Sequence, residues 1–319
     1  MAVRWIDFVG TGWAATERNE SGAKMILRVD RLAIDLPQPK GPNPNAASAV
    51  QELMGGRFGE MSTLMNYTFQ SFNFRGRDKA RPYYDLIANI AAEEYSHIEL
   101  VAYTINLLLT GATERGTDPT TTPLKSATDA RNHYHFIASG QTALPIDSMG
   151  NPWTGQNVFS SGNLKLDLLH NFFLECGARA NKIRAYEMTD DPTARAMIGY
   201  LLVRGGVHVV AYARALEHLT GADLGKLFPI PDISNKQFPE ARRLEDQGLH
   251  QIMFRFSPSD FQRLGEVWNG PHPEDGSELR VEDRIPEGAP PPNLEEEPQL
   301  TAPGVDMAFV QEVAQRLFR

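Results

Sequence analysis

Acidic and imidazole side chains at helix-compatible positions constrain the fold of this sequence more than any other feature. They are Glu60, Glu94, His97, Glu175 and His208, one or two on each of four long amphipathic segments. Glu94 and His97 form a Glu-x-x-His pair, whose spacing places both side chains on one face of a helix. In carboxylate-bridged bundles, two helices each supply one Glu and two others each supply such a pair. The sequence therefore predicts a four-helix bundle around a dinuclear metal site.

The second Glu-x-x-His pair lacks its carboxylate, because Gly205 stands three residues before His208. Two divalent ions carry four positive charges, three Glu side chains supply three negative charges, and one solvent anion would complete the balance. Oxygen and imidazole ligands suit manganese and iron equally. Since the missing carboxylate leaves room for solvent and a small substrate, we expect two-electron cycling on a molecule the size of peroxide. We expect Glu60 and Glu175 to bridge the two ions.

Each of these residues has an ordinary structural interpretation when it is considered alone. A single buried Glu is more often salt-bridged than liganding, and a single His on an apolar face is usually a core residue. Several buried carboxylates on inward faces would be costly unless they are paired, protonated or bound to metal. Their matching depth and chain order favour a shared metal site over separate structural roles.

Two further side chains share a face with these carboxylates. Tyr67 follows Glu60 by seven residues, and Lys182 follows Glu175 by the same interval. We expect both as catalytic residues that tune the ligands by hydrogen bonding and charge. The alternatives are a core aromatic residue for Tyr67 and, for Lys182, a cation that is solvated or paired with Glu187.

Residues spaced by threes and fours predict long helices over 45–74, 82–109, 163–188 and 192–220. Short connections join the first helix to the second and the third to the fourth. Residues 111–161 are rich in Thr, Pro, Gly and Asn, as expected for a long crossover. The fold class is therefore all-α, a ferritin-like four-helix bundle with one long crossover, which we place at residues 25–220.

The two ends of the chain lack this pattern. Residues 1–24 are polar and aperiodic, and we expect a flexible N-terminal extension. Residues 221–319 contain a helical run near 238–254, a stretch rich in Pro and Glu at 284–304, and an amphipathic helix at 305–318. This region has too little core for a separate domain, so we expect an extended C-terminal arm that contacts neighbouring subunits.

Charge and cysteine content exclude several classes of function. The net charge of -9 and the pI near 5.4 argue against a nucleic-acid or anionic-membrane surface. The single cysteine, Cys176, excludes an internal disulfide framework and a thiolate metal site. No uninterrupted apolar stretch reaches the ~20 residues of a spanning helix, and the N-terminus lacks signal-peptide features. We expect a soluble, cytoplasmic protein.

The segments around these residues resemble those of the manganese catalases over about residues 25–257. They are Gly-Gly-Arg-Phe-Gly-Glu60-Met-Ser-Thr-Leu-Met-Asn-Tyr67, Ala-Glu-Glu94-Tyr-Ser-His97-Ile-Glu, Leu-Leu-His-Asn-Phe-Phe-Leu-Glu175 and Leu-Leu-Val-Arg-Gly-Gly-Val-His208. The resemblance implies a ferritin-like core, two manganese ions per subunit, and disproportionation of hydrogen peroxide to water and dioxygen. It also implies a homohexamer whose C-terminal arms embrace neighbouring subunits.

Within that family, the sequence resembles the subgroup with Gly at the position of Gly205 and Lys at that of Lys182, which leaves the proton carrier open between Lys182 and solvent. The family can also bind a structural calcium ion where this sequence has Asp85 and Asn89. Two oxygen-bearing side chains are too few to assert such a site. A ferritin-like di-iron oxidase or oxygenase is the alternative enzyme, and a metal-storage protein is the alternative without catalysis.

Overall fold

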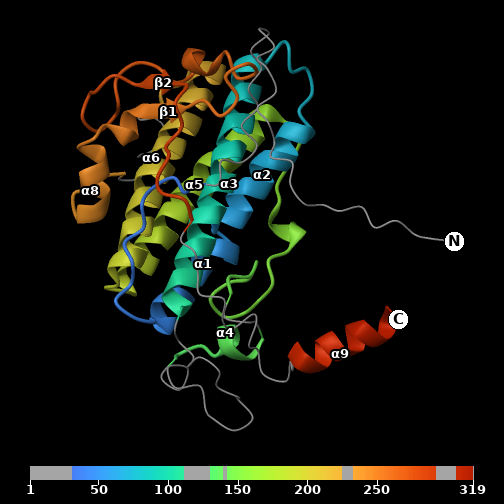
Figure 1. The fold of residues 1–319 in the computed structure, drawn as a ribbon. Helices are drawn as coiled ribbons and strands as arrows, with labels where there is room; N and C mark the ends of the chain where they lie inside the picture. Colours follow the sequence, from blue (N-terminus) through green and yellow to red (C-terminus); the bar gives the residue numbers. More distant parts are fainter. Residues whose placement is uncertain (1–30, 111–129, 139–141, 225–232, 292–306, 319) are drawn as a thin grey trace, which may run out of the picture.

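The computed structural model describes residues 31–110, 130–138, 142–224, 233–291 and 307–318. Its long helices are α1 (Pro44–Gly55), α2 (Glu60–Phe72), α3 (Arg81–Leu109), α5 (Leu164–Glu187) and α6 (Pro192–Thr220). Helices α1 and α2 follow one another along the same position of the bundle, so the long helices together form a four-helix bundle (Figure 1). Short connections lead from α2 to α3 and from α5 to α6, and residues 110–163 form the crossover. The predicted ferritin-like topology is confirmed.

The prediction of one continuous helix over residues 45–74 is wrong. The helix begins one residue earlier, at Pro44, because the Asn43 side chain accepts a hydrogen bond from the Ala46 N–H at 3.0 Å. It is then interrupted, because Gly56 and Gly59 both adopt extended backbone conformations. The consequence for the site is that Glu60 becomes the first residue of α2. A carboxylate there is favoured by the positive end of the helix dipole.

The apolar core is divided into two clusters along the bundle axis. One includes Leu86 and Ile90 of α3, Phe172 of α5 and Val210 of α6. The other includes Val50 and Leu53 of α1, Leu100 of α3 and Leu201 of α6. On α3, the residues between the two clusters include Glu94 and His97, and on α6 they include Gly205. The bundle therefore holds a polar layer between two dry cores.

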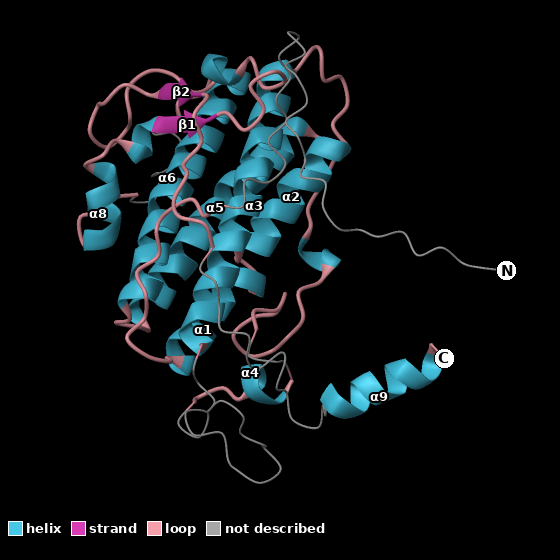
Figure 2. Ribbon diagram, in the orientation of Figure 1, coloured by secondary structure: helices cyan, strands magenta, loops and turns pink. Residues whose placement is uncertain are grey.

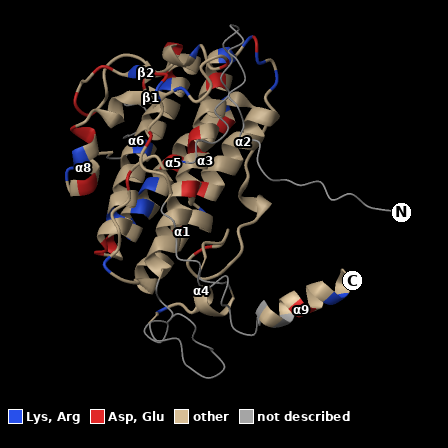
Figure 3. Cartoon of the chain, in the orientation of Figure 1, with Lys and Arg blue, Asp and Glu red and all other residues tan. Residues whose placement is uncertain are grey.

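The C-terminal region packs against the bundle of its own chain. Helix α8 (Pro239–Glu245) lies against α6, and the short parallel strands β1 (Ile252–Phe254) and β2 (Arg280–Glu282) follow beyond it (Figure 2). The prediction of a helical run over residues 238–254 is therefore only partly confirmed, since a one-turn 3-10 helix, Leu249–Gln251, and β1 replace its second half. Basic and acidic residues are interspersed over α8 and the loops near the strands (Figure 3).

The remaining helices are α4 (Tyr134–Ile137) in the crossover and α9 (Met307–Leu317), which lies apart from the bundle (Figure 1). The predicted extension over residues 1–24 lies outside the described residues. Among the described helices, α6 alone is long and apolar enough to span a membrane, and its apolar window is entirely buried among the other helices. That burial is typical of the core helix of a bundle.

Candidate metal centre

The structure brings the five predicted ligand residues together in the polar layer. Glu60 begins α2, Glu94 and His97 lie in the middle of α3, Glu175 lies on α5 and His208 on α6. Each side chain is at most 1% exposed. Three carboxylates this deeply buried need compensating positive charge.

Their donor atoms form two groups that share one residue. Glu60, Glu94 and His97 make one group, and Glu94, Glu175 and His208 make the other. His97 Nδ1 lies 3.1 Å from Glu94 Oε2 and 3.4 Å from Glu60 Oε2. His208 Nδ1 lies 2.8 Å from Glu94 Oε1 and 3.3 Å from Glu175 Oε1. Glu94 is therefore common to both groups, whereas the sequence analysis expected Glu60 and Glu175 to bridge the ions.

The orientations of these atoms fit metal ligands. Glu175 Oε2 and His208 Nδ1 are buried without an aligned hydrogen bond, as are both carboxylate oxygens of Glu60. His208 Nδ1 is close to two carboxylate oxygens but aligned with neither. His97 Nδ1 and Glu94 Oε2 are within hydrogen-bond distance of one another, whereas these four converging atoms have no aligned partner and can bind a shared cation. Imidazole and carboxylate are ligands that manganese and iron accept.

Glu93 lies on the Nε2 side of both histidines and is within hydrogen-bond distance of His208 alone. Its Oε2 atom lies 3.2 Å from His208 Nε2, and its Oε1 atom lies 3.8 Å from His97 Nε2. An acceptor at Nε2 keeps the proton on that nitrogen and leaves the Nδ1 lone pair for a metal. The sequence analysis missed Glu93, although it stands four residues before His97 on the same helical face.

Arg204 neutralises Glu93 and was missed as well. Its Nε atom donates to Glu93 Oε1 at 2.5 Å, and its Nη2 atom donates to Glu93 Oε2 at 3.1 Å. Burial opposes ionisation of Glu93, but Arg204 and His208 outweigh it and hold the pKa of that carboxyl well below its usual range. The pair also fixes the C-terminal region, because Arg204 Nη1 donates to the carbonyl oxygens of Leu249 and Ile252 at 2.9 and 2.8 Å.

Lys182 contacts a predicted ligand. Its Nζ atom lies 2.8 Å from Glu60 Oε1, and both side chains are buried. Burial alone would raise the pKa of Glu60, but Lys182 and His97 together lower it to about 2. Burial likewise opposes the charge on Lys182, and Glu60, Glu175 and Glu94 raise its pKa above the ordinary value. Lys182 is therefore a fixed cation beside the centre.

Tyr67 is hydrogen-bonded to the other lone carboxylate. Its hydroxyl donates to Glu175 Oε1 at 2.6 Å, and its side chain is fully buried. Burial and the Glu175 charge raise the pKa of Tyr67 well above its ordinary value, so the phenol keeps its proton. Thr63, which the sequence analysis missed, donates to Glu94 Oε2 at 3.0 Å. These hydroxyls orient two of the three carboxylates.

A column of polar side chains leads from Tyr67 along the bundle. The Tyr67 and Tyr212 rings lie 5.2 Å apart, and Tyr212 in turn neighbours Asn171. Asn171 and Gln70 exchange two hydrogen bonds, of 2.8 and 2.7 Å. Gln70 also lines a cavity of about 60 Å³ at the end of the bundle. These neighbouring side chains extend from Glu175 to that cavity, and the Tyr212 hydroxyl among them is buried without an aligned hydrogen bond.

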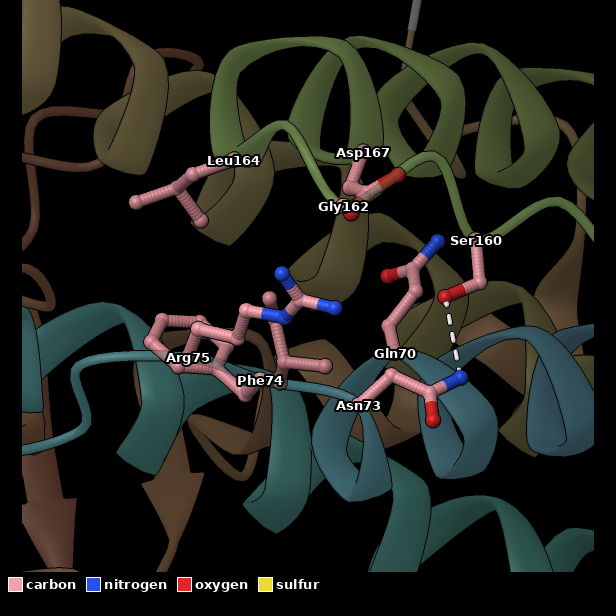
Figure 4. Close-up of a pocket in the computed structure, with 9 residues that line it drawn as sticks. Gln70, Asn73, Phe74, Arg75, Ser160, Gly162, Leu164 and Asp167 are labelled. Atoms are coloured by element: carbon pink, nitrogen blue, oxygen red, sulfur yellow. Dashed lines mark hydrogen bonds between the residues drawn. The ribbon is translucent and has the colours of Figure 1, made fainter.

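The cavity lies where α2 and α5 meet the loops that follow and precede them. Figure 4 shows the Arg75 guanidinium extending into it, with Leu164 on one side and Gln70 on the other. On its far side, Asn73 Nδ2 donates to Ser160 Oγ at 3.4 Å. Charged and amide side chains at this opening can bind small polar molecules.

The structure does not fit calcium at Asp85 and Asn89. Arg81 Nε donates to Asp85 Oδ1 at 2.6 Å, and the Arg263 N–H donates to Asp85 Oδ2 at 3.0 Å. Asn89 is engaged at both ends, since it donates to Phe254 O and accepts from Phe256 N. An arginine guanidinium therefore provides the positive charge that calcium would supply.

The chain is similar in sequence to a family of known proteins. Residues 25–316 match the family model described as manganese containing catalase. A manganese catalase of Bacillus subtilis is 35% identical over 228 residues, which cover 70% of this chain and 78% of the relative. A manganese catalase of Lactiplantibacillus plantarum is 29% identical over 230 residues, or 72% of this chain and 82% of the relative.

Among solved structures, KatB, a manganese catalase from Anabaena PCC7120, superimposes with a TM-score of 0.49 at 24% identity, covering 70% of this chain and 87% of that chain. The family match extends over the whole bundle and most of the C-terminal region. The chain belongs to the manganese-containing catalase family.

Proposed function

We propose that this enzyme disproportionates two molecules of hydrogen peroxide into two of water and one of dioxygen, with two manganese ions in each subunit. The observation that carries the proposal is the pair of donor groups joined by Glu94. Glu60 and His97 would hold one ion, Glu175 and His208 the other, and Glu94 both. Bound manganese would supply the two-electron redox chemistry that the reaction requires.

Lys182 and Tyr67 are the proposed catalytic residues. Hydrogen peroxide must lose protons when it is oxidised and gain them when it is reduced. Lys182 carries a buried positive charge beside Glu60 that would stabilise the anion of peroxide, and its ammonium group can donate a proton. Tyr67 retains its proton and holds Glu175 in one orientation. Solvent is the remaining candidate for proton carriage.

Gly205 supplies space for the substrate. A methyl group built on its Cα would lie 3.7 Å from Lys182 Nζ and 4.0 Å from Glu175 Oε2. A Glu side chain at this position would therefore extend into the region of Lys182 and the second donor group. Because Gly205 has no side chain, a molecule as small as peroxide can occupy that region.

The polar column is the proposed route for protons between the centre and the cavity near Arg75. Its side chains, Tyr212, Asn171 and Gln70, are at most 3% exposed and lie in series between Glu175 and the cavity. Amides and hydroxyls in series can relay hydrogen bonds without carrying charge.

Exposed aromatic residues support the proposed homohexamer. Phe69 and Phe72 of α2 are 41% and 67% exposed, and Phe173 of α5 is 57% exposed. Large apolar side chains on neighbouring helices are typical of subunit contacts. Helix α9, apart from the bundle, would contribute the contact predicted for the C-terminal arm. A cytoplasmic location remains part of the proposal, since Cys176 has no described disulfide partner.

Oxygen evolution tests the reaction directly. Protein produced with both manganese and iron available should contain about two manganese ions per chain and release one dioxygen for every two peroxides consumed. Iron in place of manganese, with no oxygen release, would favour the di-iron oxidase or oxygenase. A metal-replete sample without peroxide turnover would favour storage.

A further inference from the structure

A second cluster of metal-binding side chains lies in the C-terminal region. His250, His272 and Asp275 each offer one donor atom, and these atoms lie within 4.8 Å of one another. None of the three belongs to the dinuclear centre, and the proposed catalase reaction does not use them. The cluster has the composition of a two-histidine, one-carboxylate site.

The backbone holds all three side chains in defined positions. His250 lies in the 3-10 helix Leu249–Gln251, which follows Gly248 in the left-handed conformation with φ of 82°. His272 and Asp275 lie on one tight turn, closed by a hydrogen bond from the His272 N–H to Ser277 O at 2.6 Å. The Ser277 hydroxyl then fixes Asp275 Oδ1 at 2.6 Å. The cluster is therefore organised before any ligand binds.

Two of the donor spacings are close to those of a tetrahedral zinc site. Both histidines face the same carboxylate: His250 Nε2 lies 2.9 Å from Asp275 Oδ2, and His272 Nδ1 lies 3.4 Å from Asp275 Oδ1. Ligands about 2.0–2.1 Å from a tetrahedral ion are roughly 3.3 Å from one another. The two imidazole rings meet edge to face, with centroids 5.0 Å apart. Little movement would be needed to place one ion among the three.

The protonation states also favour a cation. Burial and the neighbouring His250 lower the pKa of His272, and its Nδ1 atom accepts a hydrogen bond from the Glu274 N–H at 3.3 Å, which an ion bound at Nδ1 would replace. Burial opposes ionisation of Asp275, but hydrogen bonds from Ser277 and His250 hold its pKa well below the usual range. The buried carboxylate of Glu245 adds negative charge near His250.

We propose that His250, His272 and Asp275 bind one divalent transition ion of the zinc type, with solvent as the fourth ligand. Asp275 is 46% exposed, which gives the ion access and leaves a position for solvent. The ion would join the 3-10 helix to the turn at residues 271–278. Because Arg204 donates to the carbonyl oxygens of Leu249 and Ile252, the same ion would reinforce the anchor of the Arg204–Glu93 pair. Its role would be structural.

Zinc binding to the manganese-loaded enzyme tests this site independently of the catalase proposal. The purified holoenzyme is titrated with Zn²⁺ by calorimetry, and manganese and zinc contents are measured afterwards. Substitution of Co²⁺ then gives the visible absorption of a tetrahedral site. The variants are His272→Asn and Asp275→Asn, and His133→Asn, an exposed histidine outside the cluster, is the matched control.

We expect one zinc per chain in addition to an unchanged manganese content, and a higher melting temperature. Loss of one ligand should weaken zinc binding at least about tenfold in each cluster variant, with no change in the control. If His272→Asn fails to fold, the surface variant Asp275→Asn gives the same reading. The proposal is overturned if the holoenzyme takes up no additional zinc, if zinc only displaces manganese, or if Asp275→Asn binds as the wild type does. In those cases His250 and Asp275 form only a hydrogen-bonded pair.

Discussion

Arg204 and Glu93 form a fully buried ion pair across α6 and α3, with Nε–Oε1 and Nη2–Oε2 distances of 2.5 and 3.1 Å. Glu93 also contacts His208, and Arg204 also donates to the carbonyl oxygens of Leu249, which precedes β1, and Ile252, which begins β1. The orientation of His208 is thereby connected to the packing of the C-terminal region.

Glu93→Gln should weaken manganese binding roughly 10- to 100-fold, because the negative charge of the carboxylate that orients His208 is lost. It should also lower the free energy of unfolding by about 3–5 kcal/mol, because Arg204 remains buried and unpaired. Manganese titration and urea unfolding measure the two effects. The double variant Glu93→Leu/Arg204→Met is the control: it should recover stability without recovering metal affinity. Wild-type manganese affinity in Glu93→Gln would contradict this account.

Tyr67→Phe should reduce kcat by about 10- to 100-fold, because Glu175 loses the hydroxyl that orients it. A hydrogen bond to a charged acceptor contributes about 1.5–3 kcal/mol, so stability should fall as well. Tyr186→Phe is the matched control, since its hydroxyl donates to Glu240 at 2.7 Å outside the centre. Rates are compared per bound manganese. Equal kcat values for the two variants would show that Tyr67 is structural only.

Lys182→Met should lower kcat about tenfold or more, because the charge beside Glu60 and a proton donor are both removed. Lys182→Arg keeps the charge and should restore part of the rate. Lys165→Met, at an exposed position on the same helix, should leave the rate unchanged. If Lys182→Met changes unfolding but not turnover per bound manganese, Lys182 is not catalytic.

Gly205→Ala and Gly206→Ala should separate helix stability from substrate space. Both changes should stabilise α6 by up to about 1 kcal/mol, the difference between Gly and Ala in a helix interior. Only the methyl at position 205 would approach Lys182 Nζ, at 3.7 Å, whereas nothing lies within 4 Å at position 206. We therefore expect kcat/KM for peroxide to fall in Gly205→Ala alone. Equal kcat/KM values for the two variants would show that Gly205 does not provide space for the substrate.

His135 should make the fold less stable in mild acid. Its Nε2 atom hydrogen-bonds Gln51 Oε1 at 3.0 Å, and burial lowers its pKa from 6.5 to about 4. Between these pH values the unfolded chain binds the proton and the folded chain does not, so stability falls as the pH drops from 6.5 towards 4. The contribution is on the order of 3 kcal/mol at most.

Urea unfolding at several pH values measures this contribution. His135→Gln should flatten the dependence over that range, whereas His133→Asn, at an exposed position, should not. If the free energy of unfolding of His135→Gln depends on pH as strongly as that of the wild type, other groups cause the acid sensitivity.

The sequence was sufficient to predict the topology, because Pro82 in the first turn of α3 and the N-cap residues Asn163 of α5 and Asp191 of α6 are local signals. It was also sufficient to predict the juxtaposition of the five Glu and His residues, because each falls on an inward helical face. The break before Glu60 escaped prediction, since glycines within a helical pattern are tolerated and only tertiary packing decides their conformation. Strands β1 and β2 are three residues each, too short for a periodic signal.

The contacts around the centre were harder to predict. Glu93 and Arg204 are separated by 111 residues, so no local pattern pairs them. Likewise, the choice of Glu94 over Glu60 and Glu175 as the shared carboxylate depends on how far each helix is rotated. Helical periodicity identifies a face but not a position at the level of single atoms.

Anomalous scattering at the manganese edge, from crystals of the enzyme loaded with manganese, tests the central claim most directly. We expect two peaks in each subunit: one bounded by Glu60, His97 and Glu94, the other by Glu175, His208 and Glu94. A single peak, peaks away from these side chains, or a signal only at the iron edge would contradict the account.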